Sequence, residues 1–243
     1  GFPRSARDDA AASVSDFRFQ ISDFTILDPF CGSGTILTEV MALGIPRIIG
    51  TDVDVKAVAD AKENVEWLRR QGKLADVRVE RCDVRKLSTC VAPRSVDAIV
   101  TEPYLGPPGG LGPSPSRSPS QRAGEKVRAQ VIRDLHALYL DAFREFAKVL
   151  KPGGRVVFIV PEFQRDHSPI RTNRRMERGS ERRGDTAKDR VDITRDVERL
   201  GFRRVNPFPS ALRAHATLGG REDLPYARPD QHVGRRILVF VRT

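Results

Sequence analysis

Three aspartates, Asp28, Asp52 and Asp83, each lie at or just beyond the end of a short apolar segment. When parallel strands form one sheet, their carboxyl ends meet at one edge, where ligands of such folds bind. An acid about twenty residues beyond the first turn is placed to accept hydrogen bonds from ribose hydroxyls. Together the three acids suit a ligand that carries an amine, a ribose and an adenine.

The turn after the first acid contains two glycines, Gly32 and Gly34. Glycine has no side chain to keep a ligand away from the backbone, so it suits a close approach. A dinucleotide-binding turn has the pattern Gly-x-Gly-x-x-Gly, and here the third glycine position is Leu37. The ligand indicated is therefore one without phosphate, such as S-adenosylmethionine. Taken singly, Asp52 or Asp83 could instead cap the segment that follows it.

The elements that must position these residues are predicted from apolar runs that alternate with helical patterns. Such alternation is typical of βαβ units, which build a mostly parallel sheet. The fold class expected is α/β and Rossmann-like, with a mostly parallel seven-stranded sheet and helices on both faces. The seven strands are expected at 24–27, 47–51, 77–81, 96–101, 155–160, 202–206 and 235–242.

One α/β domain is expected over residues 24–243, preceded by residues 1–23 as a tail or the remnant of an earlier segment. Residues 107–126 are rich in Pro, Gly and Ser, and residues 165–190 are rich in charged side chains with few apolar ones. Both segments are predicted to be flexible loops. A helix is expected near 187–200.

Composition restricts the class of protein and its partners. No apolar run approaches the ~18 residues that would indicate a membrane span. The net charge of +10, from 42 Lys and Arg against 32 Asp and Glu, favours a polyanionic partner, although a generically basic proteome would also produce it. Cys31, Cys82 and Cys90 lack metal-ligand spacing and are interpreted as small buried side chains in a reducing cytoplasm, without a disulfide. No metal site is expected.

Two motifs carry a resemblance to a known family. Residues 28–35 read Asp-Pro-Phe-Cys-Gly-Ser-Gly-Thr, which resembles the cofactor motif of class I S-adenosylmethionine-dependent methyltransferases. More narrowly, the chain resembles the catalytic domain of the tRNA guanine-N2 methyltransferases that usually follow a THUMP domain. The fourth strand of that family typically reads DAIVTDPPYG, and residues 97–106 here read DAIVTEPYLG. The resemblance covers residues 24 to about 160 and extends, less closely, to the last forty.

This resemblance implies a methyltransferase catalytic domain over residues 24–243 that uses S-adenosylmethionine and acts on tRNA or another structured RNA in the cytoplasm. It also leaves room for an RNA-binding domain upstream, since the chain begins with Gly1 rather than Met. The turn at Gly32 and Gly34 would surround the methionine moiety, and Asp52 would hold the ribose. The cofactor-binding residues that the resemblance implies are Asp28, Pro29, Cys31, Gly32, Gly34, Thr35, Asp52, Val53, Asp83 and Val84, of which the last two would contact the adenine.

The motif after the fourth strand would carry the chemistry. An exocyclic amine is a poor nucleophile, and two acceptors against its N–H groups can hold it and favour charge at nitrogen. By resemblance, Glu102 is the side-chain acceptor and the carbonyl of Pro103 is the other. A gapless alignment puts Leu105 in the position of the aromatic residue that stacks on the base. We prefer the alternative, in which one Pro is deleted and Tyr104 stacks on the base, because Leu supplies little stacking energy.

Three functions stay open on the sequence alone. The leading one is methylation of the exocyclic N2 of guanine in tRNA. A DNA adenine-N6 or cytosine-N4 methyltransferase shares the same strand-end logic, although the short chain leaves no room for a large base-recognition domain. The third is a catalytically silent RNA-binding scaffold that keeps the cofactor pocket. Tyr226 and Arg236 are weaker candidates for substrate contacts.

Overall fold

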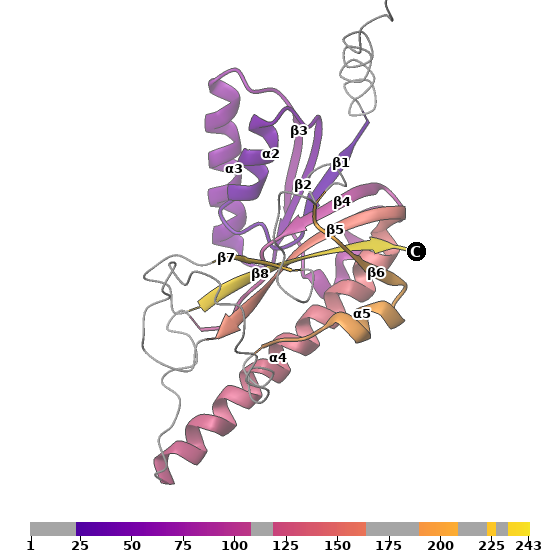
Figure 1. Ribbon diagram of the computed structural model, residues 1–243. Coiled ribbons are helices and arrows are strands. Elements are labelled where there is room, and N and C mark those ends of the chain that lie inside the picture. Colours follow the sequence, from indigo (N-terminus) through magenta and orange to yellow (C-terminus); the bar gives the residue numbers. More distant parts are fainter. Residues whose placement is uncertain (1–22, 108–118, 164–189, 209–222, 227–232) are drawn as a thin grey trace, which may run out of the picture.

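The computed structural model describes residues 23–107, 119–163, 190–208, 223–226 and 233–243 (Figure 1). Strands and helices alternate along the first two thirds of these residues, as the apolar periodicity of the sequence indicates. In chain order the elements are β1 (Thr25–Asp28), α2 (Thr35–Ala42), β2 (Arg47–Asp52), α3 (Val55–Arg70), β3 (Asp76–Arg81), the 3₁₀ helix η1 (Val84–Thr89), β4 (Val96–Thr101), α4 (Pro119–Val149), β5 (Leu150–Phe163), α5 (Thr194–Arg199), β6 (Phe202–Val205), β7 (Leu224–Tyr226) and β8 (Val233–Arg242).

All strands belong to one twisted sheet with the order β3-β2-β1-β4-β5-β8-β6, and β7 pairs with β8 off this path. The five strands from β3 to β5 are parallel to one another. β8 runs antiparallel to β5, β6 and β7. The predicted α/β fold and its seven strands are confirmed, and β7 is an eighth strand that the sequence did not indicate.

Helices cover both faces of the sheet, because alternate side chains of a strand point to opposite faces. Ile26 and Ala98 belong to the core beneath α2 and α3. Their neighbours Leu27 and Ile99 belong to the larger core beneath η1, α4 and α5. Figure 1 shows α2 and α3 together on one side of the sheet, and α4 and α5 on the other.

The larger core is organised around Phe143, a fully buried residue of α4. Its ring contacts four other aromatic rings at centroid distances of 5.1–5.3 Å, in tilted or edge-to-face arrangements that aromatic pairs prefer. These partners are Phe146, Phe158, Phe202 and Phe240. The cluster ties α4 to β5, β6 and β8, so that one face of this helix is fixed against the carboxyl-terminal half of the sheet.

One of the two segments predicted as loops is partly helical. α4 begins at Pro119, so the end of the segment 107–126 is helical rather than irregular. Proline is tolerated in the first turn of a helix, where its missing N–H has no helical partner to lose. Residues 108–118 and nearly all of 165–190 lie outside the described residues, and so does the tail at 1–22.

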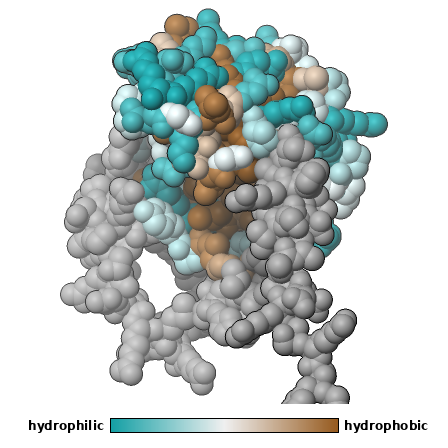
Figure 2. All heavy atoms as spheres, turned by 90° about the horizontal axis from the view of Figure 1, so that it is seen from above, coloured by the Kyte–Doolittle hydropathy of each residue, from teal (hydrophilic) through white to brown (hydrophobic). Residues whose placement is uncertain are grey.

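The surface seen from above in Figure 2 is largely hydrophilic around a narrow band of hydrophobic side chains. Within the part of the chain that the structure describes, no helix has the length and apolar character needed to cross a membrane. The same residues contain no cluster of three or more His, Cys, Asp or Glu that could hold a metal ion.

Candidate functional site

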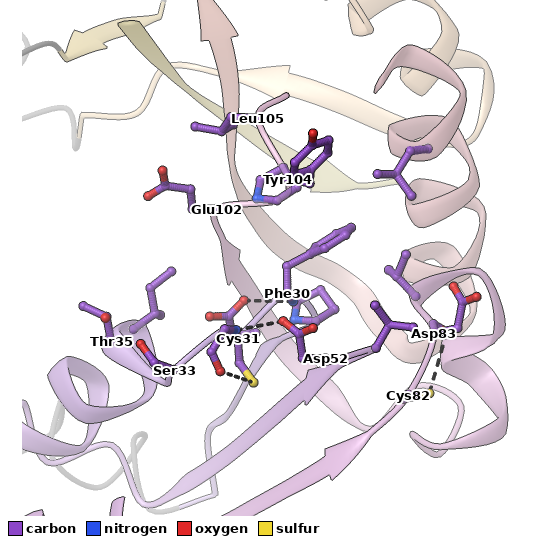
Figure 3. A pocket seen from close by; sticks show the side chains of 18 of the residues that line it. Phe30, Cys31, Ser33, Thr35, Asp52, Cys82, Asp83, Glu102, Tyr104 and Leu105 are labelled. Carbon is purple, nitrogen blue, oxygen red and sulfur yellow. Dashed lines mark hydrogen bonds between the residues drawn. The ribbon is translucent and has the colours of Figure 1, made fainter. Parts of the chain in front are cut away.

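A pocket of about 800 Å³ lies at the carboxyl ends of the parallel strands (Figure 3). Its wall is formed by the turn after β1, the ends of β2, β3 and β4, the start of η1, one residue of α4 and one of β8. All the catalytic and cofactor-binding residues expected from the sequence line it except Gly34. The pocket thus brings together side chains that are far apart in the chain.

The turn that contains Gly32 and Gly34 is held by a hydrogen bond to Asp52 and by the positive φ of both glycines. The N–H of Gly32 donates to Oδ2 of Asp52 at 2.9 Å, and the residue adopts a positive φ of 51°. Gly34 has a φ of 87° and precedes α2. A Cβ at Gly34 would lie 3.1 Å from the Cβ of Ala61 on α3. Gly34 is therefore required for the close packing of two helices, and Gly32 is the glycine that faces the pocket.

Asp52 and Asp83 also have structural partners. Besides holding Gly32, Asp52 accepts at Oδ1 from the N–H of Asp54 at 3.0 Å. Asp83 caps η1 by accepting from the N–H of Arg85 at 3.0 Å, and it pairs with the Arg85 guanidinium at 2.7 Å. The hydrogen bond from Arg85 lowers the pKa of Asp83. The capping role considered for Asp83 is thus present, and both acids still line the pocket.

Asp28 is the buried acid of the site, with 1% of its surface exposed. Its Oδ1 accepts from the hydroxyl of Thr101 at 2.6 Å and from the N–H of Phe30 at 3.2 Å. Burial, with smaller contributions from the nearby charges of Asp52 and Glu102, raises the pKa of Asp28 to about 7. The three aspartates of the pocket wall, Asp28, Asp52 and Asp83, favour a ligand with positive charge.

The turn after β4 places Glu102 and Tyr104 on opposite sides (Figure 3). The Tyr104 ring lies on the side of Phe30 and α4, and 57% of its surface is exposed. The carbonyl of Tyr104 accepts from the buried hydroxyl of Tyr139 on α4 at 2.7 Å. Glu102 accepts at Oε1 from Nε of Arg235 on β8 at 2.7 Å. Side chains from α4 and β8 therefore fix the turn from two directions.

Arg235 and Phe30 line the pocket but were not predicted from the sequence. Arg236, the neighbour of Arg235, was named as a candidate instead. Arg236 points away from the pocket into a network with Glu162 at 3.1 Å and Asp223 at 2.7 Å. Successive residues of a strand face opposite ways, so of this pair only Arg235 reaches the site. Tyr226, the other weak candidate, is half-exposed and does not line the pocket. The alternation of side chains along β8 showed that Arg235 and Arg236 face opposite ways. Which of the two faces the pocket depends on the pairing of β8 with β5, which the sequence does not reveal.

The cysteines correct the expectation of three reduced thiols. Cys82 and Cys90 form a disulfide, with their Cα atoms 6.5 Å apart. This bond could not be predicted from the spacing of the cysteines, because it depends on η1 turning the chain back after β3. Cys31 is a free, buried cysteine of the pocket wall. Burial raises the pKa of its thiol to about 12, so it stays protonated and does not act as a nucleophile.

The pocket fits the cofactor indicated by the sequence. The pKa of the buried Asp28 lies at about 7, and a cationic amine or sulfonium beside it would favour its ionised form. Asp52 lies at the end of β2, where a carboxylate accepts from ribose hydroxyls. The fold and this site together define a class I S-adenosylmethionine-dependent methyltransferase.

The chain belongs to the methyltransferase domain family, whose model, described as "Methyltransferase domain", matches residues 21–189. A solved structure of the aminoglycoside resistance methyltransferase NpmB1 is similar in fold, with a TM-score of 0.51 and 15% sequence identity. That likeness covers 94% of this chain and 93% of the other. At this identity it supports the fold alone.

Two curated relatives are both named tRNA (guanine(10)-N2)-dimethyltransferase. The protein of Methanothermobacter thermautotrophicus is 43% identical over 81 residues, which are 33% of this chain and 22% of the relative. The protein of Methanocaldococcus jannaschii is 34% identical over 100 residues, which are 40% of this chain and 27% of the relative. The matched stretches thus span about a quarter of each relative.

Proposed function

We propose that this protein transfers a methyl group from S-adenosylmethionine to the exocyclic N2 of guanine in tRNA, within the cytoplasm. The observation that carries the proposal is the position of Glu102, whose carboxylate reaches the same pocket as Asp28 and Asp52. The names of the two archaeal relatives support guanine N2 and tRNA as the target atom and the substrate. The net charge of +10 also suits a polyanionic substrate.

In this proposal the residues divide into two groups. Asp28, Asp52, the Gly32 turn and the Asp83-Val84 segment bind the cofactor, which supplies an electrophilic methyl group. Glu102 and the carbonyl of Pro103 accept from the N–H groups of the target amine, which fixes its orientation toward that methyl. Tyr104 stacks on the base, and its exposed ring is accessible to a nucleotide. The other members of the cofactor group are Pro29, Cys31, Gly34, Thr35 and Val53.

The position of Tyr104 supports the alignment in which one Pro is deleted and Tyr104 stacks on the base. Phe30 lies between the acids of the cofactor side and Tyr104 in Figure 3, so two aromatic rings line the path that a flipped base would take. Aromatic stacking of this kind is worth ~1–3 kcal/mol per base. Further contacts with RNA are proposed for an RNA-binding domain upstream, as the resemblance implies.

The test is incubation of unfractionated tRNA with the protein and isotopically labelled S-adenosylmethionine, followed by mass spectrometry of the nucleosides. Labelled N2-methylguanosine or N2,N2-dimethylguanosine is the expected product. Label in N6-methyladenine or N4-methylcytosine after incubation with DNA would instead support a DNA methyltransferase. Cofactor binding without any labelled nucleoside would support the silent scaffold. The variant Glu102→Ala is the matched control for methylation by a contaminant.

A further inference from the structure

The ion pair between Glu102 and Arg235 joins two distant parts of the chain at the mouth of the pocket. β8 pairs with β5, and Arg235 lies opposite Pro161. β4 pairs with the other edge of β5, with Thr101 beside Phe158. Because β5 extends beyond the end of β4, the start of β8 reaches the catalytic turn. This register places Arg235 within hydrogen-bond distance of Glu102.

This pair is partly shielded from water, since 23% of the Arg235 side chain and 36% of the Glu102 side chain are exposed. The 2.7 Å bond between Nε and Oε1 is a charge-assisted hydrogen bond, which is stronger than one between neutral groups. Asp28 and Asp52 also lie in this pocket. The guanidinium therefore places a positive charge and several N–H donors beside Glu102 at this side of the pocket.

Glu102 and Arg235 present a hydrogen-bond acceptor and a hydrogen-bond donor side by side. A carboxylate offers about four lone-pair sites, so Glu102 can accept from Arg235 and from a base at the same time. A guanidinium is a planar fork of donors that suits a carboxylate on one edge and a carbonyl oxygen on another. Guanine presents a complementary edge, with the acceptor O6 next to the donors N1–H and N2–H. Adenine presents the opposite order, with an amino donor at the position of O6.

We propose that Arg235 donates to O6 of the target guanine while Glu102 accepts from its N1–H and N2–H. Arg235 is in this way a specificity-determining residue, and the inference rests on the proposed function. The same contact holds N2 against the carboxylate. A base that lacks O6 cannot form this charge-assisted hydrogen bond, and the lost bond lowers its affinity relative to guanine.

The experiment compares two nucleotides by titration calorimetry in the presence of S-adenosylhomocysteine. Guanosine 5′-monophosphate has O6 and N1–H, whereas 2-aminopurine riboside 5′-monophosphate keeps the N2 amine and lacks both, so only the part of the difference that Arg235→Ala removes is assigned to O6. We expect the wild-type protein to bind the guanine nucleotide at least tenfold more tightly, and Arg235→Ala to reduce that ratio by about tenfold. Arg235→Lys should give an intermediate ratio, since an ammonium supplies charge without the planar fork. Arg203→Ala, at an exposed position of β6, should leave the ratio unchanged.

Affinity for S-adenosylhomocysteine, measured on each variant, shows that the fold and the cofactor site are intact. If Arg235→Ala does not fold, the ratio for Arg235→Lys decides. Equal binding of both nucleotides by the wild-type protein would overturn the assignment, and so would an equal loss of affinity for both in Arg235→Ala or Arg235→Lys. Labelled methyladenine or methylcytosine in the product assay would contradict the proposed function itself. Labelled N2-methylguanosine together with an unchanged ratio would contradict only the role of Arg235.

Discussion

The hydroxyl of Tyr139 donates to the carbonyl of Tyr104 at 2.7 Å, and this bond links the middle of α4 to the turn after β4. Tyr139 is fully buried and packs edge-to-face on Phe158, with ring centroids 5.0 Å apart. Burial raises the pKa of its phenol, so the hydroxyl keeps its proton and remains a donor. The backbone of the turn is therefore held by a residue that does not line the pocket.

Replacing Tyr139 with Phe tests this support. The ring and its packing stay, while the carbonyl of Tyr104 loses its buried donor, which costs ~1–3 kcal/mol. We expect a lower free energy of unfolding in urea and a reduced rate of methylation, with little change in affinity for S-adenosylhomocysteine. Unchanged stability together with an unchanged rate would show that the bond has no role.

Glu102 is tested by a graded series of substitutions. Glu102→Ala removes the acceptor and should lower the single-turnover rate by ~10²–10³. Glu102→Gln keeps one oxygen and loses the charge, so its rate should fall between those of Ala and the wild type. Glu102→Asp restores the family's usual acid, and near-normal activity would support a shared mechanism. Affinity for the cofactor should change little in all three, and a wild-type rate in Glu102→Ala would refute a catalytic role for this residue.

Asp52 should determine cofactor affinity. Asp52→Ala loses the acceptor proposed for the ribose, a loss of ~1.5–3 kcal/mol, and also releases the N–H of Gly32. Calorimetry should show at least tenfold weaker binding of S-adenosylmethionine. Asp54→Ala is the matched control, because Asp54 caps α3 and does not line the pocket. It should lower stability by ~1 kcal/mol and leave affinity unchanged.

Asp28 should make stability depend on pH. Its pKa is about 7 in the folded protein, above the usual 3.8, so between about pH 4 and pH 7 the folded state holds a proton that the unfolded state has lost. Its contribution to stability is full below this window and is lost as the pH rises through it, by at most ~1.4 kcal/mol per unit. We expect the difference in urea stability between wild type and Asp28→Asn to fall across the window. A constant difference would contradict the raised pKa.

Gly34 and Gly44 allow a paired test of close packing. Both have positive φ, 87° and 82°, so alanine should cost each about 1–2 kcal/mol of backbone strain. A Cβ at Gly34 would also lie 3.1 Å from the Cβ and 3.2 Å from the Cα of Ala61, whereas at Gly44 it would meet no atom within 4 Å. Thermal unfolding should therefore show a larger loss for Gly34→Ala. Equal losses would mean that α2 and α3 adjust freely.

The seven longer strands were predictable, most of them because they are apolar runs of the right length between turn signals. β7 was missed because it has three residues, one of them a proline, and is recognisable only by its pairing with β8. The acids of the cofactor site were predictable, since each lies at a strand end. The residues that contact the turn after β4 were not predictable. Arg235 is separated from Glu102 by 133 positions and Tyr139 from Tyr104 by 35.

The disulfide between Cys82 and Cys90 closes a short covalent ring around the segment that contains Asp83 and Val84. Such a ring restricts the unfolded chain more than the folded one, so part of the entropy of ordering η1 is removed before any ligand arrives. With the thiols reduced, that ordering would instead be drawn from the binding energy of the ligand. The disulfide thus preorganises this part of the pocket wall.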